Sequence, residues 1–377
     1  MAGLYLHIPF CRTRCIYCDF HSGVDMSIQE RYIDALCHEL DLRVNELQGT
    51  PITTIYIGGG TPSQLSIERL QRLFNHIAQY VQLNRCQEIT IECNPDDLSP
   101  EYIEGLRSLP INRISMGIQS FDDNDLRFLR RRHSAQGAID AVRRCQEAGY
   151  DNISIDLIYG LPGQTLDMWQ YNIDRALSLG VQHLSAYALI YEEGTALMQL
   201  REQGRVQECN EELSLAMYTM LIERLEAAGY RQYEISNFAL AHHEARHNSS
   251  YWDDTPYLGL GAAAHSYDGS SRRYNPADTL AYIDAIENGK CCYDEERLTP
   301  TDRYHDMLLT RLRTRRGINI AQCKAQFDSS LIDYMYSMAA PHIICGNMEL
   351  SDGYLHITRQ GLFISDSIIS DLFVATD

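Results

Sequence analysis

Three cysteines fall close together near the start of the chain, in the stretch LYLHIPFCRTRCIYCDF at residues 4–20. They are Cys11, Cys15 and Cys18, and they follow a short apolar run that predicts a buried strand. In a reducing compartment, thiols at this spacing bind metal more often than they form disulfides. The sequence therefore predicts a metal centre just after the first strand.

The absence of a fourth nearby cysteine leaves two kinds of metal centre open. A structural zinc site uses four ligands, so His7, His21 or a more distant residue would have to complete it. A four-iron cluster held by three thiolates keeps one iron with an open position, as catalytic metal sites do for their substrates. The spacing favours the iron–sulfur cluster, and zinc is the alternative.

The composition is that of an acidic globular protein. Its 377 residues are 45% hydrophobic, and 32 basic against 51 acidic residues give a net charge of −19. A nucleic-acid partner needs a basic face, so this charge argues against one. We find no membrane-spanning apolar run and no signal peptide, and therefore expect a cytoplasmic protein. Most other cysteines are expected in the core, and the adjacent Cys291 and Cys292 are expected to be ordinary surface thiols.

Short apolar runs alternate with helical patterns over the first 230 residues. The runs predict strands at 4–8, 53–57, 88–93, 112–117, 152–158 and 182–188. Helices are expected at 165–179 and 210–228, and two more should begin at the capping sequences SIQE (Ser27) and SPEY (Ser99). This alternation implies parallel strands joined by crossover helices.

Each unusual polar sequence follows the end of a predicted strand. After the cysteines come GGGTP (58–62), ECNPD (92–96), IQSFD (118–122), DLIYGLPGQ (156–164) and YALIYEEGT (187–195). Barrel active sites collect loops from the carboxyl ends of many strands, whereas a doubly wound sheet concentrates its site at one switch point. We therefore predict an α/β fold with a partial (β/α)6 TIM-like barrel at 1–230. A connecting region at 231–300 and a mainly helical, winged-helix-like domain with a β-hairpin at 301–377 should follow.

The cysteine pattern resembles the signature of the radical S-adenosylmethionine (SAM) superfamily. The pattern is Cys11-x3-Cys15-x2-Cys18, with the aromatic Tyr17 before the last cysteine. The resemblance implies a [4Fe-4S] cluster whose open iron binds SAM, which an electron then cleaves to a 5′-deoxyadenosyl radical. It also implies a partial (β/α)6 barrel, in agreement with the strand–helix alternation. With YLHIPFC before the cluster and CDF closing it, the resemblance narrows to the oxygen-independent coproporphyrinogen oxidases and their heme-chaperone relatives, along essentially the whole chain.

The same resemblance implies a set of SAM-binding residues. The glycines at 58–60 allow the backbone to approach a ligand closely, and Arg130 stands where the family has a glycine, so the local backbone is expected to differ. From the residues alone, a core position explains Tyr5 equally well, and a solvated helix end explains Arg131 equally well. The implied set is Tyr5, Tyr17, Gly59, Gly60, Thr61, Glu92, Gln119, Arg131 and Asp156.

Two functions from different classes fit this resemblance. One is oxidative decarboxylation of coproporphyrinogen III propionates, and the other is a heme chaperone that passes heme to an acceptor protein, membrane-associated or not. Three features favour the chaperone. The first strand begins at residue 4, without the extension that contacts substrate in the oxidases. Phe20 stands where the oxidases have a further cysteine, and HNSSYW at 247–252 matches a motif typical of the chaperones.

The HNSSYW sequence supplies the candidate heme-binding residues. An imidazole such as that of His247 is a good axial ligand for heme iron, and Tyr251 and Trp252 offer flat apolar surface to a porphyrin. His265 is a second candidate ligand. A hydrogen-bonded packing role for the histidine and the aromatic pair is the alternative.

Overall fold

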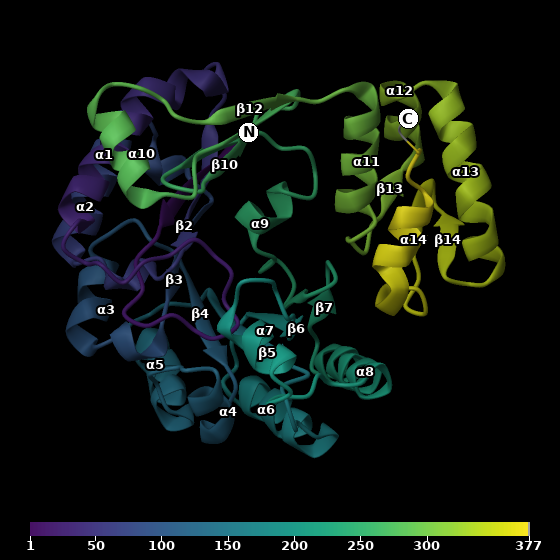
Figure 1. Ribbon diagram of the computed structural model, residues 1–377, viewed down its shortest axis with the longest axis horizontal. Coiled ribbons are helices and arrows are strands. Elements are labelled where there is room, and N and C mark those ends of the chain that lie inside the picture. Colours follow the sequence, from purple (N-terminus) through teal and green to yellow (C-terminus); the bar gives the residue numbers. More distant parts are fainter. Residues whose placement is uncertain (376–377) are drawn as a thin grey trace.

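The computed structural model describes residues 1–375, and its central feature is a curved sheet with parallel strands at its centre (Figure 1). Neighbouring strands pair in parallel because a crossover helix separates each from the next. All six predicted strands are confirmed. They are β1 (Ala2–Ile8), β2 (Ile52–Gly59), β3 (Glu88–Cys93), β4 (Arg113–Gln119), β5 (Ile153–Tyr159) and β6 (His183–Ala188).

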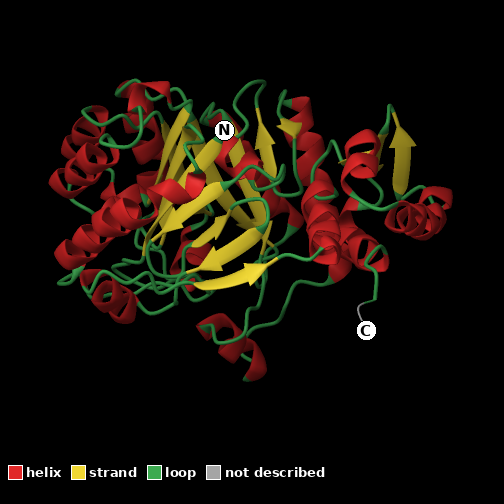
Figure 2. Cartoon of the chain, turned by 90° about the horizontal axis from the view of Figure 1, so that it is seen from above, coloured by secondary structure: helices red, strands yellow, loops and turns green. Residues whose placement is uncertain are grey.

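Helices line the outer side of this sheet, which stays open rather than closing on itself (Figure 2). The apolar faces of all but the two shortest of these helices form one continuous core with the strands. The helices are α1 (Gln29–Arg43), α2 (Ile67–Ile77), α3 (Pro100–Arg107), α4 (Asp123–Phe128), α5 (Ala135–Glu147), α6 (Leu166–Ser178), α7 (Ala196–Glu202) and α8 (Glu211–Ala227). Short 3-10 turns lie at η1 (Val44–Leu47), η2 (Pro62–Gln64), η3 (Leu83–Arg85) and η4 (Pro95–Asp97). The open sheet agrees with the predicted partial barrel.

One of the two predicted helix caps is confirmed and the other is wrong. The Ser99 side chain accepts a hydrogen bond from the backbone of Tyr102 and starts α3. Ser27 does not cap α1, which begins at Gln29 without a side-chain cap. Both the backbone N–H and the hydroxyl of Ser27 donate instead to Asp25, at 2.9 and 2.6 Å. The Ser27 hydroxyl, the predicted capping group, is therefore hydrogen-bonded to the preceding Asp25 carboxylate and does not cap the helix.

The region at 231–300 lengthens the sheet at both edges. β7 (Arg231–Gln232) and β8 (Asn237–Ala239) continue it beyond β6 in antiparallel fashion. At the other edge β9 (Tyr257–Leu260) runs parallel to β1, and β10 (His265–Tyr267), β11 (Ser271–Tyr274) and β12 (Asp294–Arg297) follow it. The helices of this region are α9 (Arg246–Ser250) and α10 (Thr279–Glu287). Residues expected to connect two domains thus belong to the main sheet.

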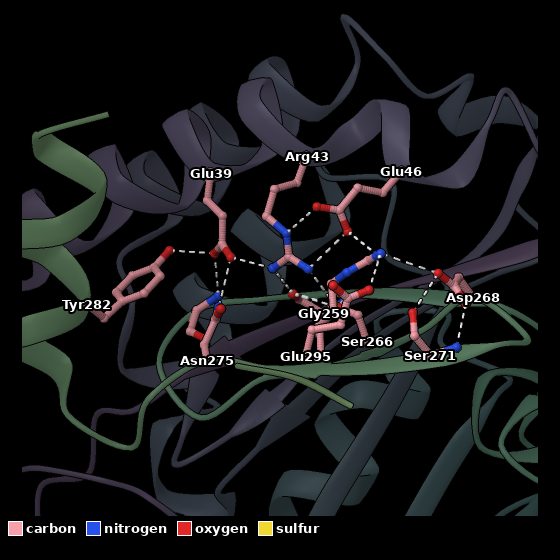
Figure 3. Close-up of polar contacts among 12 residues, drawn as sticks. Glu39, Arg43, Glu46, Gly259, Ser266, Asp268, Ser271, Asn275, Tyr282 and Glu295 are labelled. Carbon is pink, nitrogen blue, oxygen red and sulfur yellow. Dashed lines mark hydrogen bonds and ion pairs between the residues drawn. The ribbon is translucent and has the colours of Figure 1, made fainter. Parts of the chain in front are cut away.

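A buried polar network fastens this region to α1 (Figure 3). Arg43, which is 1% exposed, donates to Glu39 at 2.7 Å and to Glu46 at 2.9 Å. Glu39 in turn accepts hydrogen bonds from Asn275 and from the Tyr282 hydroxyl, each at 2.7 Å. Every charge in the network therefore has a partner, as burial requires.

The C-terminal part forms a small unit with its own apolar core, separate from the core of the barrel. Its three-stranded sheet has the order β13-β15-β14, and β14 and β15 form the predicted hairpin. The elements are α11 (Pro300–Arg311), β13 (Ile318–Asn319), α12 (Ile320–Gln326), α13 (Ser329–Ile344), β14 (Met348–Ser351), β15 (Tyr354–Ile357), η5 (Leu362–Ile364) and α14 (Ser365–Asp371). Among residues 1–375, no helix has the length and apolarity to cross a membrane.

Candidate cluster and cofactor site

A cavity of about 500 Å³ opens at the carboxyl ends of the parallel strands. It contains the predicted cluster cysteines and every predicted SAM-binding residue except Tyr5. These lining residues are Cys11, Cys15, Cys18, Tyr17, Gly59, Gly60, Thr61, Glu92, Gln119, Arg131 and Asp156. Because they come from the carboxyl ends of β2, β3 and β4, from β5 and from the loops that follow β1, β2 and α4, the fold and not the sequence spacing brings them together.

The three cysteines lie on one loop between β1 and α1, and two of them contact polar side chains of the cavity wall. The Thr61 hydroxyl is 3.4 Å from the Cys11 sulfur. The Arg131 guanidinium lies 3.3 Å from the Cys15 sulfur. The thiolate is the form of cysteine that binds metal, and hydrogen-bond donors stabilise sulfur ligands. The wall therefore suits thiolate ligands.

Backbone hydrogen bonds hold the cysteine loop across the top of the barrel. The Ile16 carbonyl accepts from the backbone of Leu197 at 2.9 Å, and the Ile16 N–H donates to the Leu129 carbonyl at 3.4 Å. These partners follow β6 and α4, on the far side of the cavity from β1. Burial raises the pKa of the Cys18 thiol to about 11, so metal binding there must release a proton.

The two histidines nearest the cysteines are already engaged, which weighs against the zinc alternative. His7 has its Nδ1 2.9 Å from the Tyr5 hydroxyl and its Nε2 2.9 Å from the His21 carbonyl. The Nε2 of His21 lies 2.9 Å from the Thr279 hydroxyl. Within residues 1–375, no group of His, Cys, Asp and Glu side chains is arranged to hold a single metal ion.

The glycines of the GGGTP loop are needed for packing as well as for ligand approach. A Cβ on Gly58 would lie 3.0 Å from the Glu92 carboxylate, and one on Gly59 would lie 2.6 Å from the His7 ring. Gly59 also has a φ of 112°, a backbone conformation that other residues rarely adopt. A Cβ on Gly60 would crowd the end of β1. The loop therefore sits tightly against β1 and β3 while its backbone lines the cavity.

Glu92 and Asp156 bring two carboxyl groups to the same cavity. Glu92 accepts from the Tyr56 hydroxyl at 2.7 Å and from the Gly59 N–H at 3.0 Å. Burial, with a smaller contribution from the charge of Asp156, raises the pKa of Glu92 to about 7, against the two hydrogen bonds that lower it. Burial likewise raises the pKa of Asp156 to about 6. Both groups therefore change charge close to neutral pH.

Arg131 lies inside the cavity, so the solvated helix end is wrong for this residue. Its guanidinium donates to the Asn94 side chain at 2.5 Å and to the Gly117 carbonyl at 2.6 Å. Its buried Nε has no hydrogen-bond partner among the described residues. Arg130 has a φ of 58°, a conformation that glycine adopts readily and other residues rarely do. Gln119 also has a positive φ, 71°, where the pairing of β4 and β5 shifts register.

Tyr5 is the predicted SAM-binding residue that the structure leaves off the cavity wall. It stacks on Tyr56 with ring centroids 6.2 Å apart, and Tyr56 lines the cavity instead. Sequence reasoning missed Tyr56, although its position two residues before Gly58 on a strand places both on one face. The deeper wall adds polar residues that no motif indicated, namely Arg113, Ser115, Ser154, His183 and Ser185.

The HNSSYW sequence closes the opposite, amino end of the barrel. The backbone N–H groups of Arg246 and His247, at the start of α9, donate to Glu88, the first residue of β3, at 2.8 and 2.9 Å. The His247 ring is fully buried, with Nδ1 2.9 Å from the Thr54 hydroxyl and Nε2 2.9 Å from the Tyr251 hydroxyl. Neither nitrogen is free, so heme ligation by His247 stays a prediction that requires Tyr251 to leave Nε2.

The other candidate heme residues also lie apart from the cysteines. Trp252 is partly buried next to α9, and His265 is exposed on β10, near Arg272. Neither lines the cavity, whereas Asn248 of the HNSSYW sequence does. The structure thus brings the cluster and SAM residues together and places the predicted heme residues elsewhere.

The open barrel and its clustered thiols are those of a radical SAM protein, and comparison with known proteins agrees. The family model described as the radical SAM superfamily matches residues 5–176, and the one described as the HemN C-terminal domain matches residues 298–364. The chain is 22% identical to coproporphyrinogen III oxidase (HemN) from Escherichia coli, with a TM-score of 0.84 over 98% of this chain and 89% of that one. This likeness confirms the fold.

Individual proteins of similar sequence show to which group of radical SAM proteins the chain belongs. Heme chaperone HemW of Bacillus subtilis is 35% identical over 98% of each chain. Heme chaperone HemW of Mycobacterium tuberculosis is 32% identical over 98% of this chain and 94% of its own length. The mitochondrial radical S-adenosyl methionine domain-containing protein 1 of Danio rerio is 28% identical over 99% of this chain and 87% of its own. The chain belongs to the HemW family of the radical SAM superfamily.

Proposed function

We propose that this protein is a heme chaperone, which binds heme and transfers it to an acceptor protein. The observation that carries the proposal is the likeness to proteins named heme chaperone HemW, which extends over 98% of both chains for the Bacillus subtilis protein. An isolated barrel motif would support only the superfamily. Likeness through the C-terminal unit and the HNSSYW region supports the whole function. The acceptor protein and a cytoplasmic location stay predictions.

The chain's thiols fit the [4Fe-4S] cluster that the superfamily implies. Cys11, Cys15 and Cys18 line one cavity and would hold three irons. Thr61 and Arg131 contact two of these sulfurs, and hydrogen bonds to sulfur tune such clusters. When bound, the cluster supplies an iron with an open position and one electron. The chain's own part is to keep the three sulfurs in place through the anchored loop around Ile16.

The remaining wall fits SAM, which is a cation with a ribose and an amino acid end. The Glu92 carboxylate is placed to accept hydrogen bonds from ribose hydroxyls, and Tyr56 holds it in position. The backbone at Gly59 and Gly60 is open to the cavity for the amino acid end. The unpartnered Nε of Arg131 is available to a carboxylate. Gln119 and Asp156 complete the proposed set; Tyr5 would act through Tyr56.

Coproporphyrinogen III oxidation is the second candidate, because the fold matches that of HemN from Escherichia coli. At 22% identity that likeness concerns the fold alone. Phe20, where a further cysteine is expected for the oxidases, weighs against this activity.

A hemin titration of the anaerobically reconstituted protein, followed by Soret absorbance, tests the proposal. Saturable one-to-one binding is the expected result. Absence of specific binding would contradict the chaperone function, and decarboxylation of coproporphyrinogen III would then be assayed. A parallel titration of His247→Ala tests the axial ligand. Weaker binding by a folded variant supports ligation, and unchanged binding leaves His247 with its packing role.

A further inference from the structure

The cavity is blocked at one end and open at the other. At the amino end, α9 packs across the strands through the backbone bonds to Glu88 and the buried ring of His247. Asn248 forms part of the cavity floor there. At the carboxyl end the cysteine loop and the loop after β6 form the rim. The cysteine loop and the loop after β6 therefore border the open end of the cavity.

The cavity is of a size for one small molecule. Its volume, about 500 Å³, lies within the range of roughly 300–1,000 Å³ that is typical of sites for single drug-sized ligands. The residues that fit SAM already line its interior. The rim is therefore the part of the cavity that is left for a tetrapyrrole when SAM occupies the interior.

The rim carries exposed apolar side chains. Phe20, after the last cluster cysteine, and Ile190, after β6, both line the cavity, and each is 63% exposed. Among residues 1–375, five large apolar side chains are more than 60% exposed, and Phe20 and Ile190 are two of them. Apolar groups exposed together beside a cavity mark a binding surface.

The rim also provides a cation within a strongly acidic protein. Arg14 lines the cavity, is exposed, and lies 3.5 Å from the Cys18 carbonyl. Asp19 and Glu192 also line the cavity, so Arg14 is the cation of this rim that can pair with an anionic group on a ligand. Heme has this character, because its planar macrocycle is apolar and its two propionates lie along one edge. The apolar macrocycle of heme therefore matches Phe20 and Ile190, and its propionates match Arg14.

We propose that the rim formed by Phe20, Ile190 and Arg14 is the heme-binding surface of this protein. The apolar side chains cover the faces of the macrocycle, and Arg14 pairs with a propionate. This inference rests on the proposed heme chaperone function and names its site. Heme bound here lies over the entrance and so restricts the exchange of SAM. The HNSSYW sequence closes the barrel at its other end.

The test is a hemin titration of the full reconstituted chain carrying Phe20→Ser and Ile190→Ser together. We expect the dissociation constant for hemin to rise by about tenfold or more, because two apolar contacts are lost. Ile344→Ser is the matched control, since Ile344 is 85% exposed on the C-terminal unit. Its hemin affinity should equal that of the unmodified chain. Iron content is measured for each variant to show that the cluster is retained.

Two further measurements distinguish the rim from other surfaces. Hemin should slow the release of radiolabelled SAM from the unmodified chain and not from the double variant. Arg14→Gln should weaken hemin by several-fold but leave the dimethyl ester of hemin unaffected, because the ester has no propionate charge. Unchanged hemin affinity in the double variant, or equal weakening in Ile344→Ser, would overturn the assignment. Absence of hemin binding by the unmodified chain would instead refute the proposed function itself.

Discussion

The two ends of the barrel use similar residues in opposite ways. At the amino end, His247 and Glu88 are buried and have hydrogen-bond partners on every side. At the carboxyl end, Glu92 lies four residues along the same strand as Glu88 but faces a cavity. Burial also shifts the pKa values at both ends, each toward the neutral form of the group. Burial lowers the pKa of His247 to about 3, which keeps it neutral, and raises that of Glu92 to about 7.

Tyr56 joins the two ends. Its ring stacks on His247 with centroids 5.3 Å apart, and its hydroxyl donates to Glu92 at 2.7 Å. Glu92 then binds the backbone of Gly59. The comparison teaches that a buried polar residue marks a ligand site only where a cavity leaves its atoms exposed. It also shows that residues at the closed amino end can hold side chains of the open carboxyl end in position.

The largest expected effect comes from removing a thiol at the open end. Cys15→Ala should abolish the cluster, because the two remaining cysteines cannot hold it. Iron content and visible absorbance after anaerobic reconstitution measure the loss. Cys345→Ala is the control, since Cys345 is an exposed free cysteine of the C-terminal unit. Normal iron content in the Cys15 variant would show that the cluster has other ligands.

A substitution at the closed amino end should lower the stability of the protein and leave the iron–sulfur cluster intact. His247→Ala removes a buried ring and leaves the Thr54 and Tyr251 hydroxyls without their partner. We expect the free energy of unfolding to fall by about 2–4 kcal/mol. Urea denaturation measures the change, with the exposed His38 on α1 replaced by alanine as control. A change no larger than that of the control would contradict the packing role.

The pKa of Glu92 predicts how SAM affinity depends on pH. With a pKa of about 7, Glu92 is mainly protonated at lower pH and a carboxylate at higher pH. Only the carboxylate accepts both ribose hydroxyls, so affinity should rise by about tenfold from about pH 6 to about pH 8. Equilibrium binding of SAM measures it. Asp156 also titrates in this cavity. Glu92→Gln retains Asp156, so this variant should lose most of the pH dependence of SAM affinity if Glu92 causes it.

The smallest change in SAM affinity should come from a substitution of Tyr56, which connects the amino and carboxyl ends of the barrel. Tyr56→Phe keeps the stacking on His247 and removes the hydrogen bond that lowers the pKa of Glu92. SAM affinity near neutral pH should fall by several-fold, about 1 kcal/mol, and recover at higher pH. Tyr80→Phe, which removes a surface hydrogen bond to Asp41, is the control. A loss that does not depend on pH would show that Tyr56 acts on SAM in another way.

The open end was largely predictable from the sequence, because its parts are local signals. Apolar runs located the strands, and the polar loops after them gave the cavity wall. The resemblance supplied Arg131, whose place beside Cys15 depends on a loop distant in sequence. Tyr56 was missed because it lies within a strand, where a tyrosine ordinarily signals core packing.

The packing role of the HNSSYW residues at the closed amino end was not predictable from the sequence. The same residue types serve in a buried core and in a heme site. A histidine beside aromatic side chains looks the same whether its nitrogens meet iron or the hydroxyls of Thr54 and Tyr251. The added strands at 231–300 escaped prediction for a simpler reason. β7 has only two residues and β8 and β10 have three, which is too short for a periodic pattern.

The anchoring of Ile16 has a consequence for biogenesis. The cluster cysteines are synthesised well before the backbone partners of their loop, which are at Leu129 and Leu197. At roughly 5–20 residues per second, synthesis needs about 10–40 s to provide the second of these partners. During that interval the thiols are present without their final geometry, so metal insertion must await most of the nascent barrel.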